Sequence, residues 1–500
     1  MQSVYKQKLA TVQESRDIDS KTINEYGISG DMLMETAGFQ AADIIVRISE
    51  KWQQPKILIL CGKGNNAGDG LVIARYLSLK GYHISVAMLL GVDSLSEDCR
   101  KNYNRLKNIR NDSNTLCIIE NPDEVALDKA DIIIDALFGT GLQDAVREPA
   151  KSWIQKINRT KAFTISLDIP SGLDGDSGKV LGVAVKADYT IQFGTRKLGL
   201  HFGDGSGYSG NLEFCPLSFP SSEAESITRE ALDTFSHPHY LDFKKGEHKY
   251  KNGVVHIISG SAGMTGACVL AAKSAWYTGL GSVIVHTPAG LLSVYDKYLL
   301  QQVKKAYGST ESRHLTLSMA KDILENIQQK EGVLLIGPGL GREKETVEAI
   351  QIICENYDGN LVIDADALYA VDYQKIKGQV IITPHTGELK FLDAPNFESE
   401  YQRLLWVENA AVTHSMTILS KGTPTIAAFP NSRSFVTTYD SRVFTRSGFG
   451  DVLAGKLAGF WSISEDKYIA IQTALSDMAQ RYTRFSQTDN THLPDPADYV

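Results

Sequence analysis

Residues 56–70, KILILCGKGNNAGDG, run from a short apolar strand through a glycine-rich turn into the start of a helix. A strand, turn and helix in this order are typical of a parallel sheet, with the turn at its carboxyl edge. Unpaired N–H groups at the start of the helix favour an anion such as phosphate. Residues 446–455, RSGFGDVLAG, form a second such turn. The chain therefore has two candidate phosphate-binding sites.

Short apolar runs alternate with amphipathic helical stretches in both halves of the chain. In the first half they extend from KILIL at residue 56 to KAFTISLDI at residues 161–169, after a helix expected over residues 32–48. In the second half they extend from GVVHIISG at residue 253 to MTILSKG at residue 416. Continuous apolar strands separated by helices predict a doubly wound α/β domain in the first half and a second α/β domain after it.

The length of the chain indicates more than one domain. Its 500 residues exceed the size at which a single hydrophobic core keeps growing, so two domains, or three, are expected. Residues 219–240 are polar, contain prolines and show no sustained strand pattern, so we assign them to a linker. The predicted domains are residues 1–218 and 241–500.

Composition narrows the class of protein. A net charge of -8 and the lack of a dense Lys/Arg run argue against a nucleic-acid or membrane-surface binder. The six cysteines are scattered, with no CxxC pair and no zinc spacing, which fits a reducing compartment. No signal peptide or membrane-spanning run is apparent in the sequence. We expect a cytoplasmic, soluble protein that forms a homo-oligomer.

Oxygen-bearing side chains follow several strands of the first half. The turn itself is weak evidence, because its GxGxxG/A pattern is equally consistent with a tight turn that needs glycine. A single acid in such a place is also more often a solvated loop carboxylate. Polar residues at three strand ends could instead hold a hard cation or a polar ligand while one carboxylate transfers protons. These residues are Asn65, Asn66, Asp69, Asp135, Asp168 and Ser171.

Four segments of the first half resemble the NAD(P)H-hydrate epimerase family, in the same order along the chain. They are LMETAGF (33–39), GNNAGDG (64–70), DALFGTGL (135–142) and LDIPSG (167–172). The resemblance implies a Rossmann-like domain with Asp168 at the reacting centre and a potassium ion held by Asn66, Asp135 and Ser171. The hydrate contacts that it implies are Asn65, Asn66, Ala67, Gly68, Asp69, Gly139, Thr140, Gly141, Leu142, Gln143, Asp144, Ala145 and Asp168. Ala67 stands where the family usually has glycine, and its methyl group should fit if φ is negative.

The implied reaction is chemically reasonable. The 6-hydroxyl of a hydrated dihydronicotinamide is on a carbon bonded to nitrogen, so that centre can invert through a ring-opened or an iminium-like species. Both routes need proton transfer at a positioned group, and Asp168 is the best candidate.

The second turn places Asp451 in the first turn of a helix, after Gly448 and Gly450. Backbone N–H groups there can form an anion hole, and the carboxylate can reach a hydroxyl that attacks a phosphoryl group. On its own, the arrangement is explained equally well by a favourable helix-dipole contact, worth ~0.3–1 kcal/mol.

Further segments of the second half resemble the ribokinase-like superfamily, and the chain has no Walker A pattern. They are IGPGLG (336–341), VIDADAL (362–368), TPHTGE (383–388) and SKGTPT (420–425). Together with residues 248–283, they are similar to the ADP/ATP-dependent NAD(P)H-hydrate dehydratase family. The implied hydrate contacts are Ala267, Gly339, His385 and Asp451. The implied adenine-nucleotide contacts are Lys421, Gly422, Thr423, Pro424, Thr425 and Gly450.

This resemblance implies that Asp451 assists the substrate hydroxyl in attacking the terminal phosphate of the nucleotide, with Mg²⁺, before phosphate is eliminated. Arg446 and Phe449 depart from the family's longer glycine-rich turn. The resemblance to bacterial members favours ADP over ATP.

Three hypotheses remain from the sequence. The preferred one is a bifunctional enzyme that acts on NADHX and NADPHX: the first domain epimerises the R and S hydrates, and the second dehydrates the S form with ADP or ATP. The second is a hydroxymethylpyrimidine- or pyridoxal-type kinase fused to another α/β module. In the third, the first domain binds a ligand without catalysing a reaction.

Overall fold

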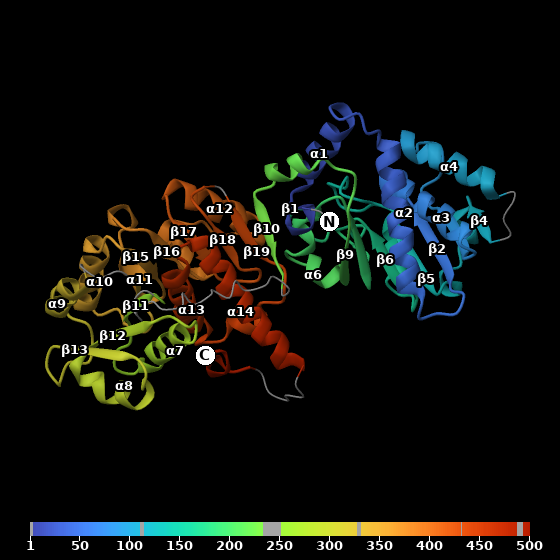
Figure 1. Cartoon of the computed structure of the whole chain (residues 1–500). Coiled ribbons are helices and arrows are strands. Elements are labelled where there is room, and N and C mark those ends of the chain that lie inside the picture. The colour runs from blue at the N-terminus through green and yellow to red at the C-terminus, as the bar shows by residue number, and fades with distance from the viewer. Residues whose placement is uncertain (1–3, 111–114, 234–251, 328–331, 432, 488–493) are drawn as a thin grey trace. The chain divides into compact units, whose positions relative to one another are not determined.

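The computed structural model describes residues 4–110, 115–233, 252–327, 332–431, 433–487 and 494–500 (Figure 1). The chain divides into two compact units. One comprises Met1–Glu230 with Ser399–Tyr401, and the other comprises Ala231–Glu398 with Gln402–Val500. Each unit is built on one large sheet, so each is described by itself.

The first unit has a seven-stranded sheet in the order β4-β3-β2-β5-β6-β7-β9, with every neighbouring pair parallel. From β2 the chain moves outward through β3 to β4, then returns to β5 on the other side of β2 and continues through β6 and β7. The strand order therefore reverses between β2 and β5, which is where open α/β sheets bind ligands. The strands are β2 (Lys56–Cys61), β3 (His83–Met88), β4 (Leu116–Ile119), β5 (Ile132–Ala136), β6 (Phe163–Leu167), β7 (Tyr189–Phe193) and β9 (Asn211–Cys215).

Helices cover both faces of this sheet, as a doubly wound fold requires. Alternate residues of β2 face opposite ways: Ile57 and Ile59 join one core with α2 and α3, and Leu58 and Leu60 join another with α5. The helix expected over residues 32–48 is confirmed as α2. The helices are α1 (Val12–Asn24), α2 (Gly30–Ser49), α3 (Asn65–Leu79), α4 (Glu97–Arg110), α5 (Ala150–Ile157) and α6 (Gly205–Tyr208).

A second, two-stranded sheet of this unit was not predicted. It pairs β1 (Leu9–Ala10) in parallel with β8 (Arg196–Lys197). Because α1 follows β1 directly, this pairing brings the start of the chain to the segment that follows β7.

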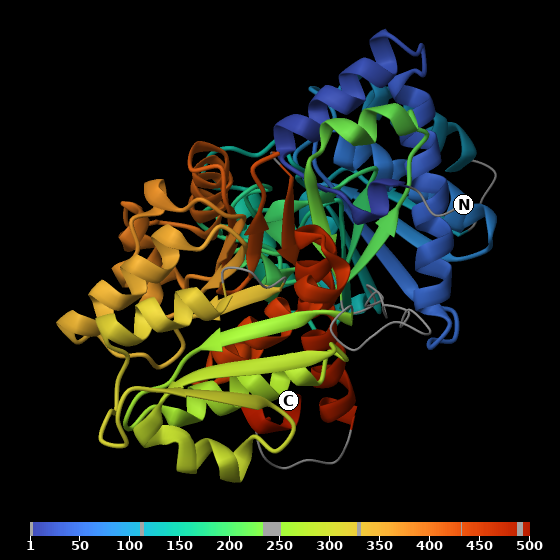
Figure 2. The same cartoon turned by 60° about the vertical axis from the view of Figure 1, so that its left-hand side comes forward.

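The second unit has a ten-stranded sheet in the order β10-β19-β18-β17-β16-β15-β14-β11-β12-β13. Strands β11 to β17 pair in parallel, and Figure 2 shows β11, β12 and β13 side by side in green to yellow. Strands β18 and β19 pair antiparallel. The strands are β10 (Arg229–Leu232), β11 (Val254–Ile258), β12 (Ser282–Pro288), β13 (Val303–Tyr307), β14 (Val333–Ile336), β15 (Asn360–Ile363), β16 (Val380–Ile382), β17 (Thr417–Ser420), β18 (Ile426–Ala428) and β19 (Ser434–Thr437).

Helices α7, α13 and α14 contribute to the main core of this unit, together with the strands that they cover. The predicted α/β class is confirmed in both units. The helices are α7 (Thr265–Trp276), α8 (Leu292–Tyr298), α9 (Leu317–Ile327), α10 (Lys344–Asn356), α11 (Asp366–Ala370), α12 (Glu400–Thr413), α13 (Phe449–Ser464) and α14 (Lys467–Gln487). Among the described residues, no helix is both long enough and apolar enough to cross a membrane.

The structure differs from the sequence analysis in residues 219–240, which were assigned to a linker without a strand. A short 3-10 helix, η5 (Ser221–Ser226), and the edge strand β10 lie in this segment. Leu232 is fully buried in the core of the second unit. The strand was missed because four residues at a sheet edge carry too little periodicity to stand out from polar surroundings. Residues 234–240 lie outside the described residues.

Candidate functional sites

A cavity of about 690 Å³ lies at the carboxyl edge of the seven-stranded sheet, beside the loops that follow β2 and β5. This position is the point where the strand order reverses. Eight of the predicted hydrate contacts line it: Asn65, Asn66, Asp69, Gly139, Thr140, Gly141, Leu142 and Asp168. The structure therefore brings together residues from three separate motifs.

The other predicted contacts lie outside the lining of this cavity. Ala67 is buried in the core as part of α3, so its methyl group is accommodated. Gly68 packs against Met34, whose sulfur would lie 2.5 Å from a Cβ at that position. Gln143, Asp144 and Ala145 are exposed. The contacts of these residues with the hydrate remain predictions.

The predicted cation ligands lie together beside this cavity. The carboxylate of Asp135 is fully buried, with Oδ1 2.6 Å from Ser171 Oγ and Oδ2 2.8 Å from Ser166 Oγ. Ser171 Oγ is 3.1 Å from the carbonyl oxygen of Phe138, to which Asn66 Nδ2 donates at 3.0 Å. Burial raises the pKa of Asp135, and hydrogen bonds from Ser171 oppose the rise.

One buried oxygen of this cluster lacks a partner. Asn66 Oδ1 has no hydrogen bond within the described part of the chain. A buried amide oxygen without a partner is costly unless a ligand or an ion satisfies it. With Asp135, Ser171 and the Phe138 carbonyl close by, it completes a set of oxygens suited to a hard cation.

Asp168 faces the cavity together with a lysine that the sequence did not reveal. Asp168 follows β6 at φ 64°, an uncommon conformation for a residue other than glycine. Its Oδ1 accepts a short hydrogen bond from Lys197 Nζ on β8. The Lys197 side chain is only 4% exposed, and Nζ also donates to the carbonyl oxygens of Phe193 at 2.7 Å and Thr195 at 3.0 Å. The carboxylate is therefore held at the cavity wall by a buried cation.

The carboxyl groups of Asp19, Asp69 and Asp98 line the same cavity. Burial raises the pKa of Asp19 to about 6, Lys197 opposes this shift, and Asp168 adds to it. Burial also raises the pKa of Asp69, and the charges of Asp168 and Asp19 add to the rise. The raised pKa values of Asp19 and Asp69 favour their protonated forms more than in an exposed aspartate. The cavity can therefore hold both a proton donor and a proton acceptor.

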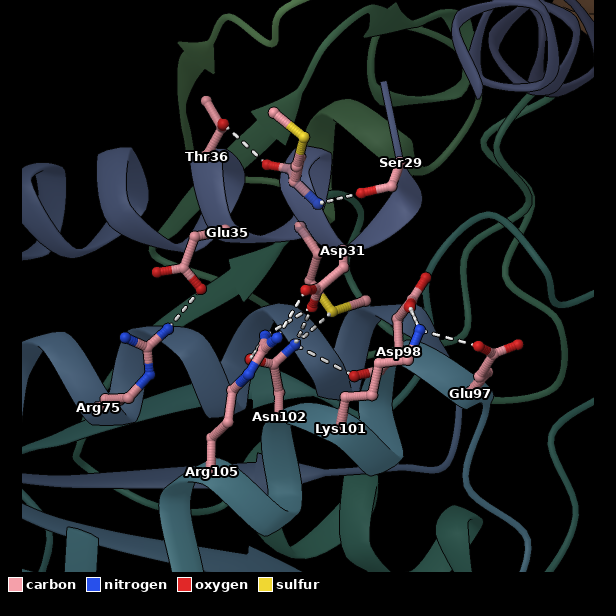
Figure 3. Close-up of polar contacts among 12 residues, drawn as sticks. Ser29, Asp31, Glu35, Thr36, Arg75, Glu97, Asp98, Lys101, Asn102 and Arg105 are labelled. Carbon is pink, nitrogen blue, oxygen red and sulfur yellow. Dashed lines mark hydrogen bonds and ion pairs between the residues drawn. The ribbon is translucent and has the colours of Figure 1, made fainter. Parts of the chain in front are cut away.

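Helix α2 contributes residues to the wall of the cavity, and ion pairs join this helix to its neighbours α3 and α4 (Figure 3). Arg105 on α4 donates from both Nη atoms to the Asp31 carboxylate, each at 2.6 Å, and lowers the pKa of Asp31. Arg75 on α3 pairs with Glu35, which also accepts from Tyr76 at 2.6 Å. Glu35 belongs to the LMETAGF segment, yet its contacts join α2 to α3 instead of facing the cavity.

In the second unit, the predicted contacts follow strands of the parallel part of the sheet. Gly339 follows β14, His385 follows β16, Lys421 follows β17, and Ala267 lies in the first turn of α7 after β11. Because parallel strands end at one edge, these motifs meet at the carboxyl edge of the sheet.

Asp451 lies in the first turn of α13, next to an ion pair. Lys421 Nζ donates to Asp364 Oδ1 at 2.6 Å, and Thr383 Oγ1 donates to the same oxygen at 2.7 Å. A Cβ at Gly450 would lie 3.4 Å from Lys421 Nζ, so this ammonium lies against the start of α13. Burial raises the pKa of Asp451 to about 6; the charge of Asp364 adds to this shift and Lys421 opposes it. Asp364 is only 1% exposed and was not predicted as a site residue.

The predicted hydrate contacts of this unit fall into two places. Gly339 has φ 63°, and a Cβ there would lie 3.0 Å from that of Ala267, so these two residues are neighbours. His385 precedes the 3-10 helix η9 (Thr386–Leu392), and its Nδ1 accepts from the Gly387 N–H at 3.0 Å. Its main chain bridges to Lys421, while its side chain is 60% exposed. His385 is therefore placed to contact a ligand next to the ion pair.

Lys421 begins the predicted nucleotide segment, residues 421–425, which is fixed by polar contacts. The carbonyl oxygen of Gly422 accepts from Ser441 Oγ at 3.0 Å and Thr425 Oγ1 at 3.1 Å, and Thr423 Oγ1 lies 3.3 Å from Ser441 Oγ. Pro424 follows a cis peptide bond.

The two departures from the dehydratase turn are explained by packing. Phe449 is buried, with ring centroids 5.4 Å from Phe444 and 5.1 Å from Tyr499. Arg446 Nη1 donates to the carbonyl oxygen of Pro494 at 2.6 Å. Neither substitution disturbs the glycines on each side of Phe449, and Gly448 adopts φ 97°.

Comparisons with known proteins cover both units. The family model described as YjeF-related protein N-terminus matches residues 30–199, and the one described as NAD(P)H-hydrate dehydratase matches residues 255–494. A relative from Salinibacter ruber, named bifunctional NAD(P)H-hydrate repair enzyme Nnr, is 32% identical over 462 residues and covers 88% of this chain and 85% of its own length. A protein of the same name from Moorella thermoacetica is 30% identical over 465 residues; the match covers 90% of this chain and 87% of that protein.

Among solved structures, an ADP/ATP-dependent NAD(P)H-hydrate dehydratase from Bacillus subtilis, co-crystallized with ATP/Mg²⁺, matches 52% of this chain and 90% of its own, at 23% identity and TM-score 0.45. A ribokinase-like superfamily protein from Enterococcus faecalis matches 54% of this chain and 93% of its own, at 19% identity and TM-score 0.47. The resemblances to the NAD(P)H-hydrate epimerase and dehydratase families are confirmed by the family models and by these relatives.

Proposed function

Since the chain belongs to the family of bifunctional NAD(P)H-hydrate repair enzymes, we propose that its two units act in sequence on one damaged cofactor. The first unit interconverts the R and S hydrates of NADH or NADPH. The second dehydrates the S form with ADP or ATP and releases AMP or ADP and phosphate. The boundary between the two domains falls within residues 219–240, at Glu230 and Ala231, and the protein is a cytoplasmic homo-oligomer.

The observation that best supports epimerisation is the pairing of Asp168 with Lys197 on the wall of a cavity lined by predicted hydrate contacts. Inversion at C6 needs a group that takes the hydroxyl proton and later returns it. Because Asp168 faces the cavity and accepts a hydrogen bond from Lys197, this carboxylate acts as the base in the first half of the reaction. The loops after β2 and β5 hold the dinucleotide.

Potassium fits the oxygens beside this cavity. Asn66 Oδ1, Asp135, Ser171 and the Phe138 carbonyl would hold it, which would satisfy the orphaned amide oxygen and offset the buried charge of Asp135. When bound, the cation would supply positive charge for the phosphate groups of the hydrate. The start of α3, which carries Asn66, and the segment after β5, which carries Phe138, would then be fixed in the arrangement that binds substrate.

Dehydration in the second unit starts at Asp451. Its carboxylate takes the proton of the substrate hydroxyl as the hydroxyl oxygen attacks the terminal phosphate of the nucleotide. Lys421, held by Asp364, and the N–H groups at the start of α13 stabilise the charge that develops on the transferred group. The electron pair of the ring nitrogen then expels phosphate from C6, and loss of a proton from C5 gives the dihydronicotinamide. Mg²⁺ would come with the nucleotide, held by its phosphates and by waters.

The test is to incubate the purified chain with a mixture of R and S hydrates and either ADP or ATP. Recovery of the near-ultraviolet absorbance of NADH from both epimers is expected, faster with ADP. Phosphorylation of hydroxymethylpyrimidine or pyridoxal without recovery of NADH would favour the kinase hypothesis. Recovery from the S hydrate alone would leave the first unit as a binding module.

A further inference from the structure

Helix α1 contributes to the first cavity although it lies before residue 30, where the match to the family model begins. Ser15, Arg16 and Asp19 of α1 line the cavity together with Asp168 and Lys197. Of these three residues, Asp19 carries the only carboxyl group. This helix therefore adds chemistry that the matched motifs do not contain.

Helix α1 is docked onto the cavity by contacts at its first turns. Ser15 Oγ lies 2.6 Å from Thr195 Oγ1, two residues before Lys197. Arg16 Nη2 donates to the carbonyl oxygen of Thr140 in the predicted hydrate loop, at 3.0 Å. Asp19 follows Ser15 by four residues, so both side chains lie on one face of the helix. The contacts that hold Ser15 and Arg16 thus hold Asp19 against the cavity.

The ring-opened route for the proposed epimerisation uses two proton transfers at different atoms, which two separate groups can serve. When the C6–N1 bond opens, one group must take the hydroxyl proton and another must give a proton to N1. Asp168, which is paired with Lys197, supplies only the group that takes the hydroxyl proton. We propose that Asp19 is a second catalytic residue of the first unit, acting as the general acid toward N1 while Asp168 acts as the base; this role rests on the proposed epimerase function.

The step balances as follows. Asp168 takes the hydroxyl proton, the C6–O bond becomes a carbonyl, and the electron pair of the C6–N1 bond moves to N1, which takes the proton of Asp19. Rotation about C5–C6 then presents the other face of the aldehyde. On closure, N1 attacks C6 and returns its proton to Asp19, and the oxygen takes the proton back from Asp168. Only the configuration at C6 has changed.

The charges around Asp19 suit this division of roles. Charged groups from several elements line the same cavity as Asp19. They are Lys197 on β8, Asp168 after β6, Asp69 on α3, Asp98 on α4 and Arg16 on α1 itself. The pKa of Asp19 is raised to about 6 by burial, Lys197 opposes the rise and Asp168 adds to it. Roughly a tenth of Asp19 is then protonated at pH 7. Asp19 and Asp168 line one cavity in different surroundings, and two carboxyl groups placed in this way can serve as acid and base.

The experiment is Asp19→Asn in the full chain, with Asp17→Asn as the matched control, because Asp17 is on the same helix but exposed. Pure S hydrate is supplied without a nucleotide, so that only exchange to the R epimer is measured, against a blank without protein. Asp19→Asn should lower kcat for exchange by roughly 10²- to 10⁴-fold. The control should stay within threefold of the wild type.

The pH profile separates catalysis from a structural role. Because the acid must carry a proton, the wild-type exchange rate should fall as pH rises above about 6, and this limb should be absent from the residual activity of Asp19→Asn. Asp19→Glu, which keeps the carboxyl group, should recover part of the rate. Exchange within threefold of wild type in Asp19→Asn, an unchanged alkaline limb, or equal loss in Asp19→Glu would overturn the proposal.

Folding is checked in the same samples, since nucleotide-dependent dehydration of the S hydrate in the second unit and the thermal unfolding curve should match the wild type. A shifted unfolding curve with the alkaline limb retained would make Asp19 structural and overturn its catalytic role. No exchange by the wild type itself would refute the proposed epimerase function, a result that differs from loss in the variant alone.

Discussion

Replacing Asp364 by Asn should both slow dehydration and move its pH dependence. The amide keeps the size of the side chain but removes the negative charge that holds Lys421 Nζ at 2.6 Å. A hydrogen bond between charged groups contributes about 1.5–3 kcal/mol. If that energy serves to position Lys421 on the transferred phosphate, kcat/KM should fall by roughly 10- to 150-fold.

The pH dependence follows from Asp451, which must be ionised to accept a proton. Its pKa is raised to about 6, so wild-type kcat/KM should decline below about pH 6. Burial is the main cause and the charge of Asp364 the next. Removing that charge lowers the pKa of Asp451, so in Asp364→Asn the decline should begin at a lower pH.

The assay is NADH formation from pure S hydrate with saturating nucleotide, which bypasses the first unit. Asp393→Asn is the control, because Asp393 is exposed and its φ of 61° is one that asparagine tolerates. An acid limb that stays near pH 6 in Asp364→Asn, or an equal loss of rate in the control, would refute the coupling between Asp364, Lys421 and Asp451.

Three further predictions concern the first unit. Lys197→Met leaves Asp168 without its cation, so epimer exchange should be lost. The free energy of unfolding measured in urea should fall by about 3–5 kcal/mol. A variant as stable as the wild type, with wild-type exchange, would contradict the role of the ion pair. Replacing K⁺ by Li⁺ in the buffer should slow epimerisation by the wild type but should not change the already low rate of the Asn66→Ala variant. An equal response of wild type and variant would contradict a potassium site at Asn66. Glu35→Gln should cost about 1–3 kcal/mol of stability because it weakens a charged pair between helices, with little change in kcat for exchange; a selective loss of kcat would place Glu35 in catalysis.

The sequence was most informative where function depends on short motifs at strand ends. The segments Asn65–Asp69, at the start of α3, and Gly139–Leu142 were identified because each comes shortly after an apolar strand, and parallel strands bring such segments to one edge. Strands β2, β5 and β6 are neighbours in the sheet, so these two segments and Asp168, which follows β6, end at one edge and line one cavity.

Residues whose position depends on distant pairing could not be found in this way. Lys197, which pairs with Asp168, lies on β8, and β8 pairs with β1 over only two residues; Leu9 and Ala10 show no pattern that signals a partner near residue 196. Asp364 lies within a recognised motif, but its role depends on Lys421, which is 57 residues later. Side-chain contacts at such separations are set by tertiary packing, which local propensity does not encode.

The most direct test of the central claim uses pure R hydrate with ADP and follows both epimers and NADH over time. The wild-type chain should convert all of the R hydrate to NADH, with S hydrate as a transient intermediate. Asp451→Asn should equilibrate R and S without forming NADH, and Asp168→Ala should form NADH no faster than R converts to S without protein. Rapid formation of NADH from R hydrate by Asp168→Ala, or no epimer exchange by Asp451→Asn, would contradict two separate sites acting in sequence on one damaged cofactor.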